Sequence, residues 1–283
     1  MDVRTVLLLL ALTVVSITTY ANNKVIYGDD NRMEVAEAPT RFAAWADSTA
    51  AMISNYQLSN DGERVYVRAK TLALGGKCKT ERFAEQMTPA SCSGFLVGKD
   101  LLVTAGHCIT KLSDCNKYSW MFGFHASSDV MTTFITDNSN VYKCVKVISR
   151  SFSRLTKNDY ALVKLDRAVT GRKPLKLRRR GKVDSNARLI IIGHPTGLPT
   201  KIADGATVRK KSWKYFKANL DSYGGNSGSA VINEDSGEVE GILVRGDRDY
   251  VYDSEQSCYV SNRCSDSGCR GEDVTYIKNV SGL

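Results

Sequence analysis

Short runs rich in β-branched and aromatic residues recur along most of this chain, whereas helical periodicity is scarce. Clusters of Gly, Asn, Asp and Ser separate the runs, as is typical of turns. Many short strands joined by turns predict an all-β chain that folds as barrels or as a sandwich. The strand candidates are RVYVRAKTLAL, CSGFLVG, DLLVTAG, WMFGFH, VYKCVKVIS, DYALVKL, ARLIIIG, YFKANL, SAVIN and VEGILVRG.

Three further segments bear on how these strands are organised. A turn cluster inside INEDSGEVEG, Ile232 to Gly241, predicts a hairpin. The polar, basic stretch around residues 167–185 is weakly patterned and has apolar strands on both sides, so we place a subdomain boundary there. The segment FAAWADSTAAMISNY near residue 50 fits either a short helix or an extended conformation, and the pattern leaves both open.

The N-terminus predicts a secretory signal over residues 1–21. Arg4 precedes the apolar run TVLLLLALTVVSITT, and small residues stand at the cleavage position. A membrane span needs about 20 apolar residues, and this run is shorter. We therefore expect a secreted chain, extracellular or periplasmic, with no membrane contact after the signal is removed.

The 8 cysteines agree with export, because an even count in an exported chain favours disulfides. Cys258, Cys264 and Cys269 cluster, and a metal site there is conceivable, but no histidine is near them. Disulfides are the favoured interpretation, and we expect no metal and no cofactor.

The net charge of +9 is concentrated in two segments, residues 172–182 and 209–217. Such runs either form a solvated surface or bind anionic polymers. No nucleic-acid-binding motif accompanies them, so we expect no nucleic-acid partner.

Three residues become chemically informative when they are taken together. His107 follows a strand in LLVTAGHC, Asp159 begins the apolar strand DYALVKL, and Ser227 stands in GGNSGSA. Each alone has an ordinary structural explanation as a strand-end or turn residue. Acyl transfer, however, needs a serine oxygen, an imidazole to take its proton and a carboxylate to orient the imidazole.

The glycines around Ser227 add a second requirement of this chemistry. Gly224, Gly225 and Gly228 permit positive φ and a close substrate approach. Such a turn can aim the backbone N–H groups of Gly225 and Ser227 at one point, which would make an oxyanion hole.

The motifs TAGHC, NDYALVKL, GGNSGS and GILVRG together resemble those of the chymotrypsin-like (trypsin-fold) serine proteases. The resemblance implies a protease domain over residues 25–283, with two six-stranded antiparallel β-barrels and the active site in the cleft between them. The barrels are expected at about residues 45–168 and 185–283. By residue, it implies His107 as general base, Asp159 as its orienting acid, Ser227 as nucleophile and Gly225 as oxyanion donor.

The resemblance also implies a disulfide between Cys92 and Cys108, around the histidine loop. A pair between Cys115 and Cys144 is a weaker suggestion. The partners of the other four cysteines stay open.

Several positions depart from the animal enzymes of this family. Asn226 holds the place of the aspartate that pairs with a new N-terminal ammonium on zymogen cleavage, so that switch should be absent. GGNSGS and VIYGDDNR look instead like the secreted bacterial branch that includes glutamyl endopeptidases, and Lys24 before Val25 leaves room for a short propeptide of residues 22–24. Tyr223 replaces a pocket cysteine, and Val244 replaces a serine that supports the catalytic aspartate.

The expected specificity pocket can be compared with those of the animal enzymes and of the bacterial branch that includes glutamyl endopeptidases. The resemblance places Asp221 at the pocket floor, followed by Ser222, with Gly246 at the edge. A buried carboxylate favours a cationic partner, which predicts a Lys or Arg side chain in the pocket. Leu243 stands where the glutamyl branch has a histidine, which disfavours cleavage after Glu. Two alternatives remain: Asp221 pairs internally, or Asp273 supplies a second acid.

The predicted function is a secreted serine endopeptidase that cleaves after Arg or Lys through an acyl-enzyme, acts on proteins or peptides and is monomeric. Two alternatives remain. One is a serine protease of another primary specificity. The other is a weak or inactive protease-like protein that binds anionic polymers through its basic segments.

Overall fold

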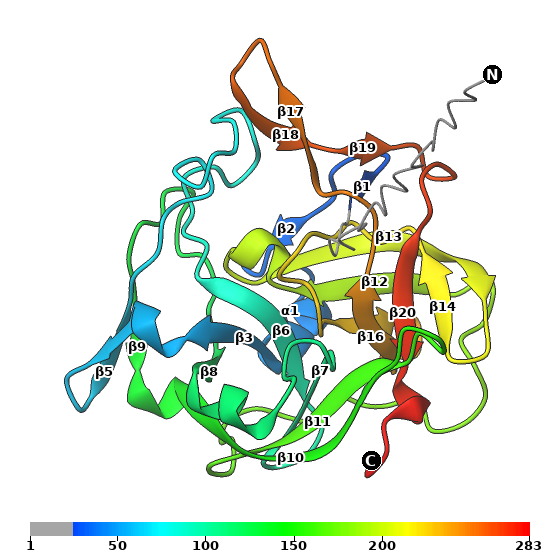
Figure 1. Cartoon of the computed structure of the whole chain (residues 1–283), viewed down its shortest axis with the longest axis horizontal. Helices are drawn as coiled ribbons and strands as arrows, with labels where there is room; N and C mark the ends of the chain where they lie inside the picture. Colours follow the sequence, from blue (N-terminus) through cyan, green and yellow to red (C-terminus); the bar gives the residue numbers. More distant parts are fainter. Residues whose placement is uncertain (1–24) are drawn as a thin grey trace, which may run out of the picture.

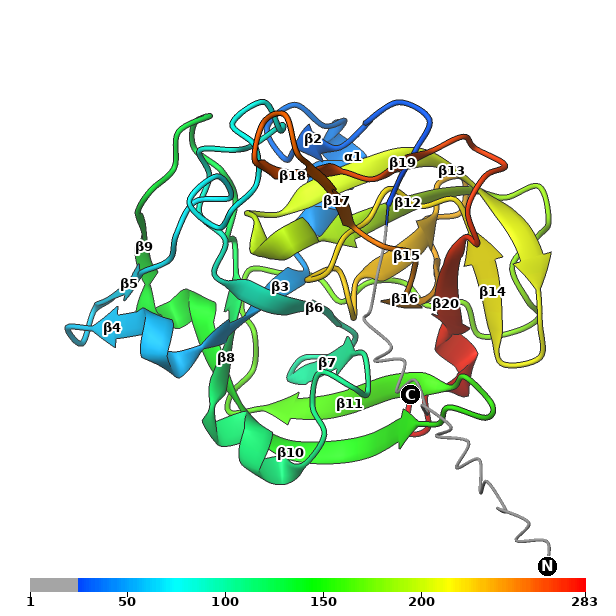
Figure 2. The ribbon, with the colours of Figure 1, turned by 45° about the horizontal axis from the view of Figure 1, so that its top comes forward.

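The computed structural model describes residues 25–283. The predicted signal, and the propeptide of residues 22–24, lie outside the described residues. Most of the described chain forms two antiparallel β-barrels that pack against each other, which confirms the predicted fold. In Figures 1 and 2, the blue-to-green first barrel lies beside the second barrel, which runs from yellow-green to red.

The first barrel closes in the order β10-β11-β7-β6-β3-β8. Its core is apolar, with Trp120, Phe95 and Leu162 fully buried. The predicted strand DYALVKL has the same bounds as β11. The strands are β3 (Thr49–Ser54), β6 (Ala90–Leu96), β7 (Leu101–Thr104), β8 (Tyr118–Phe122), β10 (Val141–Phe152) and β11 (Asp159–Leu165).

The second barrel has the order β12-β15-β16-β20-β14-β13, and pairing of β12 with β13 closes it. The predicted hairpin is present, because β15 and β16 pair in antiparallel fashion across residues 234–238. The short β2 (Met33–Glu34) extends β13 at its edge. The strands are β12 (Arg188–Gly193), β13 (Lys201–Lys211), β14 (Tyr215–Ala218), β15 (Ala230–Asn233), β16 (Val239–Arg245) and β20 (Glu272–Tyr276).

Smaller elements surround the barrels. The segment near residue 50 contains both conformations that were left open, because α1 (Thr40–Ala46) leads into β3. The candidate strand RVYVRAKTLAL forms only the short β5 of a side sheet, outside the barrel. The remaining strands are β1 (Ile26–Tyr27), β4 (Leu58–Asn60), β5 (Arg64–Val67), β9 (Phe134–Asp137), β17 (Tyr250–Asp253), β18 (Cys258–Ser261) and β19 (Arg263–Cys264).

The 3₁₀ helices and the chain end complete the fold. The final residues cross back to the first barrel, where Ser149 Oγ donates a hydrogen bond to the Ser281 carbonyl oxygen, and Figure 1 shows the C-terminus beside β10. None of the helices within residues 25–283 has the length and apolar character to cross a membrane. The 3₁₀ helices are η1 (Asn55–Gln57), η2 (Leu112–Asn116), η3 (Asn138–Asn140), η4 (Pro195–Gly197) and η5 (Ile277–Asn279).

Candidate active site

His107 and Asp159 meet because two neighbouring strands of the first barrel run in opposite directions. Thr104, at the end of β7, pairs with Ala161 near the start of β11. His107 follows Thr104 by three positions and Asp159 precedes Ala161 by two, so both lie at the same edge of the barrel.

The contact between these two side chains is short and buried. His107 Nδ1 lies 2.9 Å from Asp159 Oδ2, and the His107 backbone N–H donates to Asp159 Oδ1 over 3.1 Å. The carboxylate is inaccessible to solvent, whereas the imidazole is 14% exposed. With Nδ1 held by the carboxylate, Nε2 is the ring nitrogen that remains for proton transfer.

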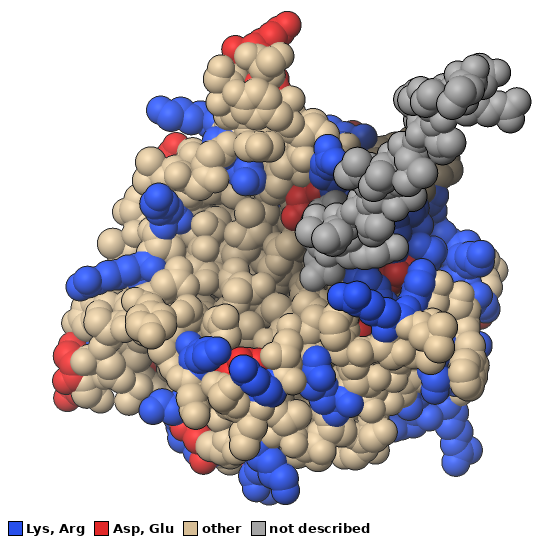
Figure 3. Space-filling model, viewed as in Figure 1, with Lys and Arg blue, Asp and Glu red and all other residues tan. Residues whose placement is uncertain are grey.

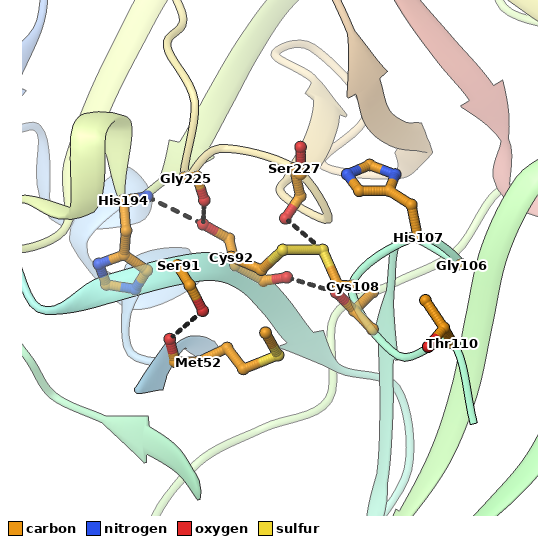
Figure 4. The surroundings of a disulfide bond; sticks show 12 residues. Met52, Ser91, Cys92, Gly106, His107, Cys108, Thr110, His194, Gly225 and Ser227 are labelled. Carbon is orange, nitrogen blue, oxygen red and sulfur yellow. Dashed lines mark hydrogen bonds between the residues drawn. A yellow bond between two sulfur atoms is a disulfide. The ribbon is translucent and has the colours of Figure 1, made fainter. Parts of the chain in front are cut away.

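Ser227 approaches this pair from the second barrel, in the turn before β15. Figure 4 shows its side chain next to the imidazole of His107. Gly225 has φ +91°, and a Cβ there would lie 2.3 Å from the carbonyl oxygen of His194, so only glycine fits. The amide of Asn226 is buried and accepts a hydrogen bond from Ser229 Oγ at 3.2 Å, so a neutral internal contact occupies this position.

Ser93 of β6 fastens the turn to the first barrel, and the sequence analysis missed it. Its backbone N–H donates to the Ser227 carbonyl oxygen over 2.8 Å. Its hydroxyl donates to the Gly225 carbonyl oxygen over 2.8 Å and accepts from the backbone N–H of His194 over 3.0 Å. Burial lowers the pKa of His194 to about 3, so this side chain is uncharged at neutral pH and packs beneath the turn.

Replacing Ser93 with alanine should lower the free energy of unfolding by about 1–3 kcal/mol, because the part-buried Gly225 carbonyl oxygen and the buried His194 N–H each lose their hydroxyl partner. Urea denaturation of the disulfide-intact protein measures the change. Ser91→Ala is the matched control, because Ser91 lies on the same strand with an exposed side chain that donates one bond to Met52. Equal stability losses in the two variants would contradict the role given to Ser93.

Arg245 supplies a second partner for Asp159. It follows Val244, which replaces the serine that supports the catalytic aspartate in the animal enzymes of the family. Its Nη1 lies 3.6 Å from Asp159 Oδ2. Its Nε lies 3.4 Å from Asp273 Oδ2, and its Nη2 donates to the Lys157 carbonyl oxygen over 2.7 Å. An ion pair therefore stands beside the carboxylate where the animal enzymes use a hydroxyl.

The carboxylate of Asp221 is turned toward the N-terminal segment. Oδ1 accepts from the backbone N–H of Tyr27 over 2.7 Å, and Oδ2 accepts from that of Asn31 over 3.4 Å. The backbone N–H of Ser222 donates to the Val25 carbonyl oxygen over 3.2 Å. These contacts correspond to the internal alternative for Asp221, with backbone amides rather than Lys or Arg as the partners.

Burial raises the pKa of Asp221 from 3.8 to about 7, although hydrogen bonds from Tyr27 and Asn31 act in the opposite direction. Since the folded-state pKa is the higher one, the stability gained from this group is fully present below about pH 4 and is lost as the pH rises through about 7. Asp221→Asn mimics the protonated acid, so its melting temperature should fall less than that of the wild type between pH 4 and about 8. Parallel curves in calorimetry would refute the assignment.

Asp273, considered as a second pocket acid, is already surrounded by cations. Its carboxylate lies 3.0 Å from Lys217 Nζ and 2.6 Å from Arg270 Nη2, in addition to the contact with Arg245. It therefore belongs to a charge cluster that Arg245 links to Asp159.

Four disulfides are present, and one borders the site. Cys92 and Cys108 are bonded, and the Cys108 sulfur lies close to the Ser227 carbonyl oxygen (Figure 4). Within the described residues, the group with metal-ligand spacing is Cys92, His107 and Cys108, but both sulfurs are consumed by the disulfide. Such bonds fit an oxidising compartment. The other pairs are Cys115–Cys144, Cys78–Cys258 and Cys264–Cys269.

The two basic segments lie side by side. Lys182 Nζ donates to the Ser212 carbonyl oxygen over 3.0 Å, and Lys211 Nζ donates to that of Val183 over 3.4 Å. On the face seen in Figure 3, basic side chains surround a largely uncharged hollow. Binding of anionic polymers to the basic segments stays a prediction.

The fold is similar to that of a solved protease structure. The chain aligns with the solved "Rv3671c protease, inactive form" at 15% identity and a TM-score of 0.50, over 86% of this chain and 90% of that one. A Glu endopeptidase in complex with MPD aligns at 16% identity and a TM-score of 0.46, over 85% and 94% of the two chains. A search of curated protein sequences gives no match.

A model of the trypsin-like peptidase domain matches residues 92–242. The matched region includes His107, Asp159 and Ser227, and it extends from β6 into β16. Because the match covers more than half of the chain, this protein belongs to the trypsin-like peptidase family.

Proposed function

We propose that this protein is a secreted serine endopeptidase that hydrolyses peptide bonds through an acyl-enzyme on Ser227. The observation that carries the proposal is the 2.9 Å contact between His107 Nδ1 and the buried Asp159 carboxylate, beside a serine on a glycine-rich turn. Secretion is supported by the predicted signal and by the four disulfides.

In the first half of the reaction, Ser227 Oγ attacks the peptide carbonyl carbon while His107 Nε2 takes the hydroxyl proton. Asp159 holds the ring and stabilises the imidazolium that forms. The backbone N–H groups of Gly225 and Ser227 stabilise the negative oxygen of the tetrahedral intermediate. The imidazolium then gives its proton to the leaving amine, the C–N bond breaks, and an ester to Ser227 remains.

In the second half, water attacks the ester carbon and His107 again acts as base. The same two N–H groups stabilise the second tetrahedral intermediate. Return of the proton to Ser227 Oγ releases the acid product. Because Asn226 has a neutral hydrogen-bond partner, this cycle needs no ion pair with a new N-terminal ammonium.

We further propose cleavage after a cationic residue. Four carboxylates stand near the turn and the pocket residues, and a buried or enclosed anion attracts a cation. They belong to Asp221, Glu272, Asp247 and Asp249.

A serine-directed fluorophosphonate tests the reaction class. We expect one phosphonyl group per chain, located on Ser227 by mass spectrometry of a digest, with parallel loss of peptide hydrolysis. Phosphonylation at another serine, or full hydrolysis by the labelled protein, would overturn the proposal.

A further inference from the structure

The two basic segments, residues 172–182 and 209–217, contain no acidic residue. The second segment forms most of the turn and the adjoining strands of the β13–β14 hairpin, whereas the first lies before β12 (Figure 1). As described above, Lys182 donates to a carbonyl oxygen of the hairpin turn, and Lys211 donates to the carbonyl oxygen that follows the first segment. The positive charge of both segments is therefore gathered at the tip of the hairpin.

The 3₁₀ helix η5 adds a further basic side chain at the same place. The Lys214 carbonyl oxygen, in the hairpin turn, accepts from Asn279 Nδ2 over 2.6 Å and from the Tyr276 backbone N–H over 3.3 Å. The ammonium groups of Lys182 and Lys278 lie 5.6 and 5.9 Å from the centre of the Tyr276 ring. Lysines from three separate parts of the sequence therefore meet around this hairpin.

These lysines have no carboxylate partner in the fold. Arg178 differs from them, because it pairs with the buried Glu240. Asp184, the nearest acid in the sequence, accepts from the Asn186 backbone N–H over 3.0 Å. Their positive charge is therefore available to an external anion. Within residues 25–283, the basic side chains around the hairpin that form no ion pair are those of Lys182, Lys211, Lys214, Lys278, Arg179 and Arg180.

Trp213 adds an aromatic surface among these charges. It stands in the hairpin turn with 74% of its surface exposed, and the Lys214 ammonium lies 4.5 Å from the centre of its ring. An exposed indole can pack against the C–H face of a sugar ring while a neighbouring ammonium binds a sulfate or carboxylate of the same polymer. Insertion into a membrane surface needs a larger apolar face, and Trp213 is the one exposed large apolar side chain within the two basic segments and η5.

We propose that the side chains of Lys182, Lys211, Lys214, Lys278 and Trp213, here called the hairpin surface, bind an anionic polysaccharide, a sugar polymer that carries sulfate or carboxylate groups. None of the proposed catalytic residues belongs to the hairpin surface. The inference therefore goes beyond the proposed peptidase activity and does not depend on it.

The test measures binding of the whole chain to heparin, which is sulfated, and to polygalacturonate, which is carboxylated, by isothermal titration calorimetry at several salt concentrations. We expect log Kd to rise with log salt concentration at a slope of about 3, because each of four lysines that meets an anionic group releases about 0.7–0.9 of a counterion. Dextran, an uncharged polymer, should not bind. Binding of either anionic polymer supports the proposal, and the tighter one identifies the anionic group.

Replacement of the four lysines with glutamine should weaken binding about tenfold or more at low salt, since each exposed charge pair contributes up to about fivefold. The matched control replaces four exposed lysines elsewhere with glutamine and so removes the same net charge, and its affinity should change less than about threefold. Trp213→Ala should weaken binding without changing the salt slope, because it removes no charge. The control lysines are Lys70, Lys79, Lys99 and Lys146.

Equal losses in the two glutamine variants, or a wild type that binds neither anionic polymer, would overturn the assignment. Tighter binding of phosphatidylserine vesicles or of double-stranded DNA, lost in the same variant, would assign the hairpin surface to a lipid or a nucleic acid instead. Lys278→Glu covers the case in which the quadruple variant does not fold. This single reversal at an exposed position should weaken binding about fivefold or more, and unchanged affinity would contradict the proposal.

Discussion

Ser227→Ala should lower kcat by about 10⁶-fold, because the reaction then has no oxygen to form the acyl-enzyme. Binding and the oxyanion N–H groups stay, so a residual rate of about 10³–10⁴ over the uncatalysed reaction should remain. The carbonyl oxygen of Ser227, which accepts from Ser93, is unchanged by the substitution. Hydrolysis of a peptide thioester that ends in lysine, under saturating substrate, measures the loss.

Ser229→Ala is the control for this experiment, because Ser229 is buried in the same turn and its hydroxyl donates to Asn226. A lost neutral hydrogen bond costs about 1 kcal/mol, which corresponds to less than tenfold in rate. If Ser227→Ala kept even a hundredth of the wild-type rate, Ser227 would not be the nucleophile.

The strands that the sequence predicted well are those whose residues are apolar on both faces. Every residue of β11 except Lys164 is buried, and β12 is buried from Leu189 to Gly193. The strand β13, Lys201–Lys211, was missed because its C-terminal half is basic and was interpreted as surface. Only the barrel shows that Ile202 and Ala206 of β13 face the core while Thr207 and Lys210 are exposed.

The triad residues were predictable because each stands in a short local motif. The residues that hold or extend the site were not, because their contacts join distant parts of the chain. Ser93 is 132 positions from Gly225, and Glu272 is 50 positions from Ser222. Nothing local distinguishes this serine or this glutamate from an ordinary strand residue.

The direction of the Asp221 carboxylate was unpredictable for the same reason. Its partner Tyr27 lies 194 positions away, in a segment whose path depends on pairing with Arg263 and Cys264. The position of Asp221 shortly before Ser227 in the sequence indicated an acid at the floor of the specificity pocket. The partner could be identified only from the path of the N-terminal segment.

Asp159→Asn should lower kcat by about 10⁴-fold while the protein stays folded. The amide oxygen can still accept the His107 backbone N–H that now contacts Oδ1 at 3.1 Å, which turns the NH₂ group toward Nδ1. An NH₂ donor there favours the tautomer with hydrogen on Nε2, and that ring cannot take the proton of Ser227. Steady-state hydrolysis of the lysine thioester measures the loss.

Arg245→Met separates the two partners of Asp159, because it removes the guanidinium and leaves the contact of the carboxylate with Nδ1 intact. Its kcat should fall far less than that of Asp159→Asn, because the carboxylate still orients the imidazole. Arg245 keeps its contacts with Asp273 and the Lys157 carbonyl oxygen when Asp159 becomes neutral, so Asp159→Asn leaves no uncompensated cation. If Asp159→Asn unfolds at a temperature close to that of the wild type, its loss of rate is due to the wrong tautomer of His107. Equal rate losses in Asp159→Asn and Arg245→Met would instead assign the loss to the ion pair between Arg245 and Asp159.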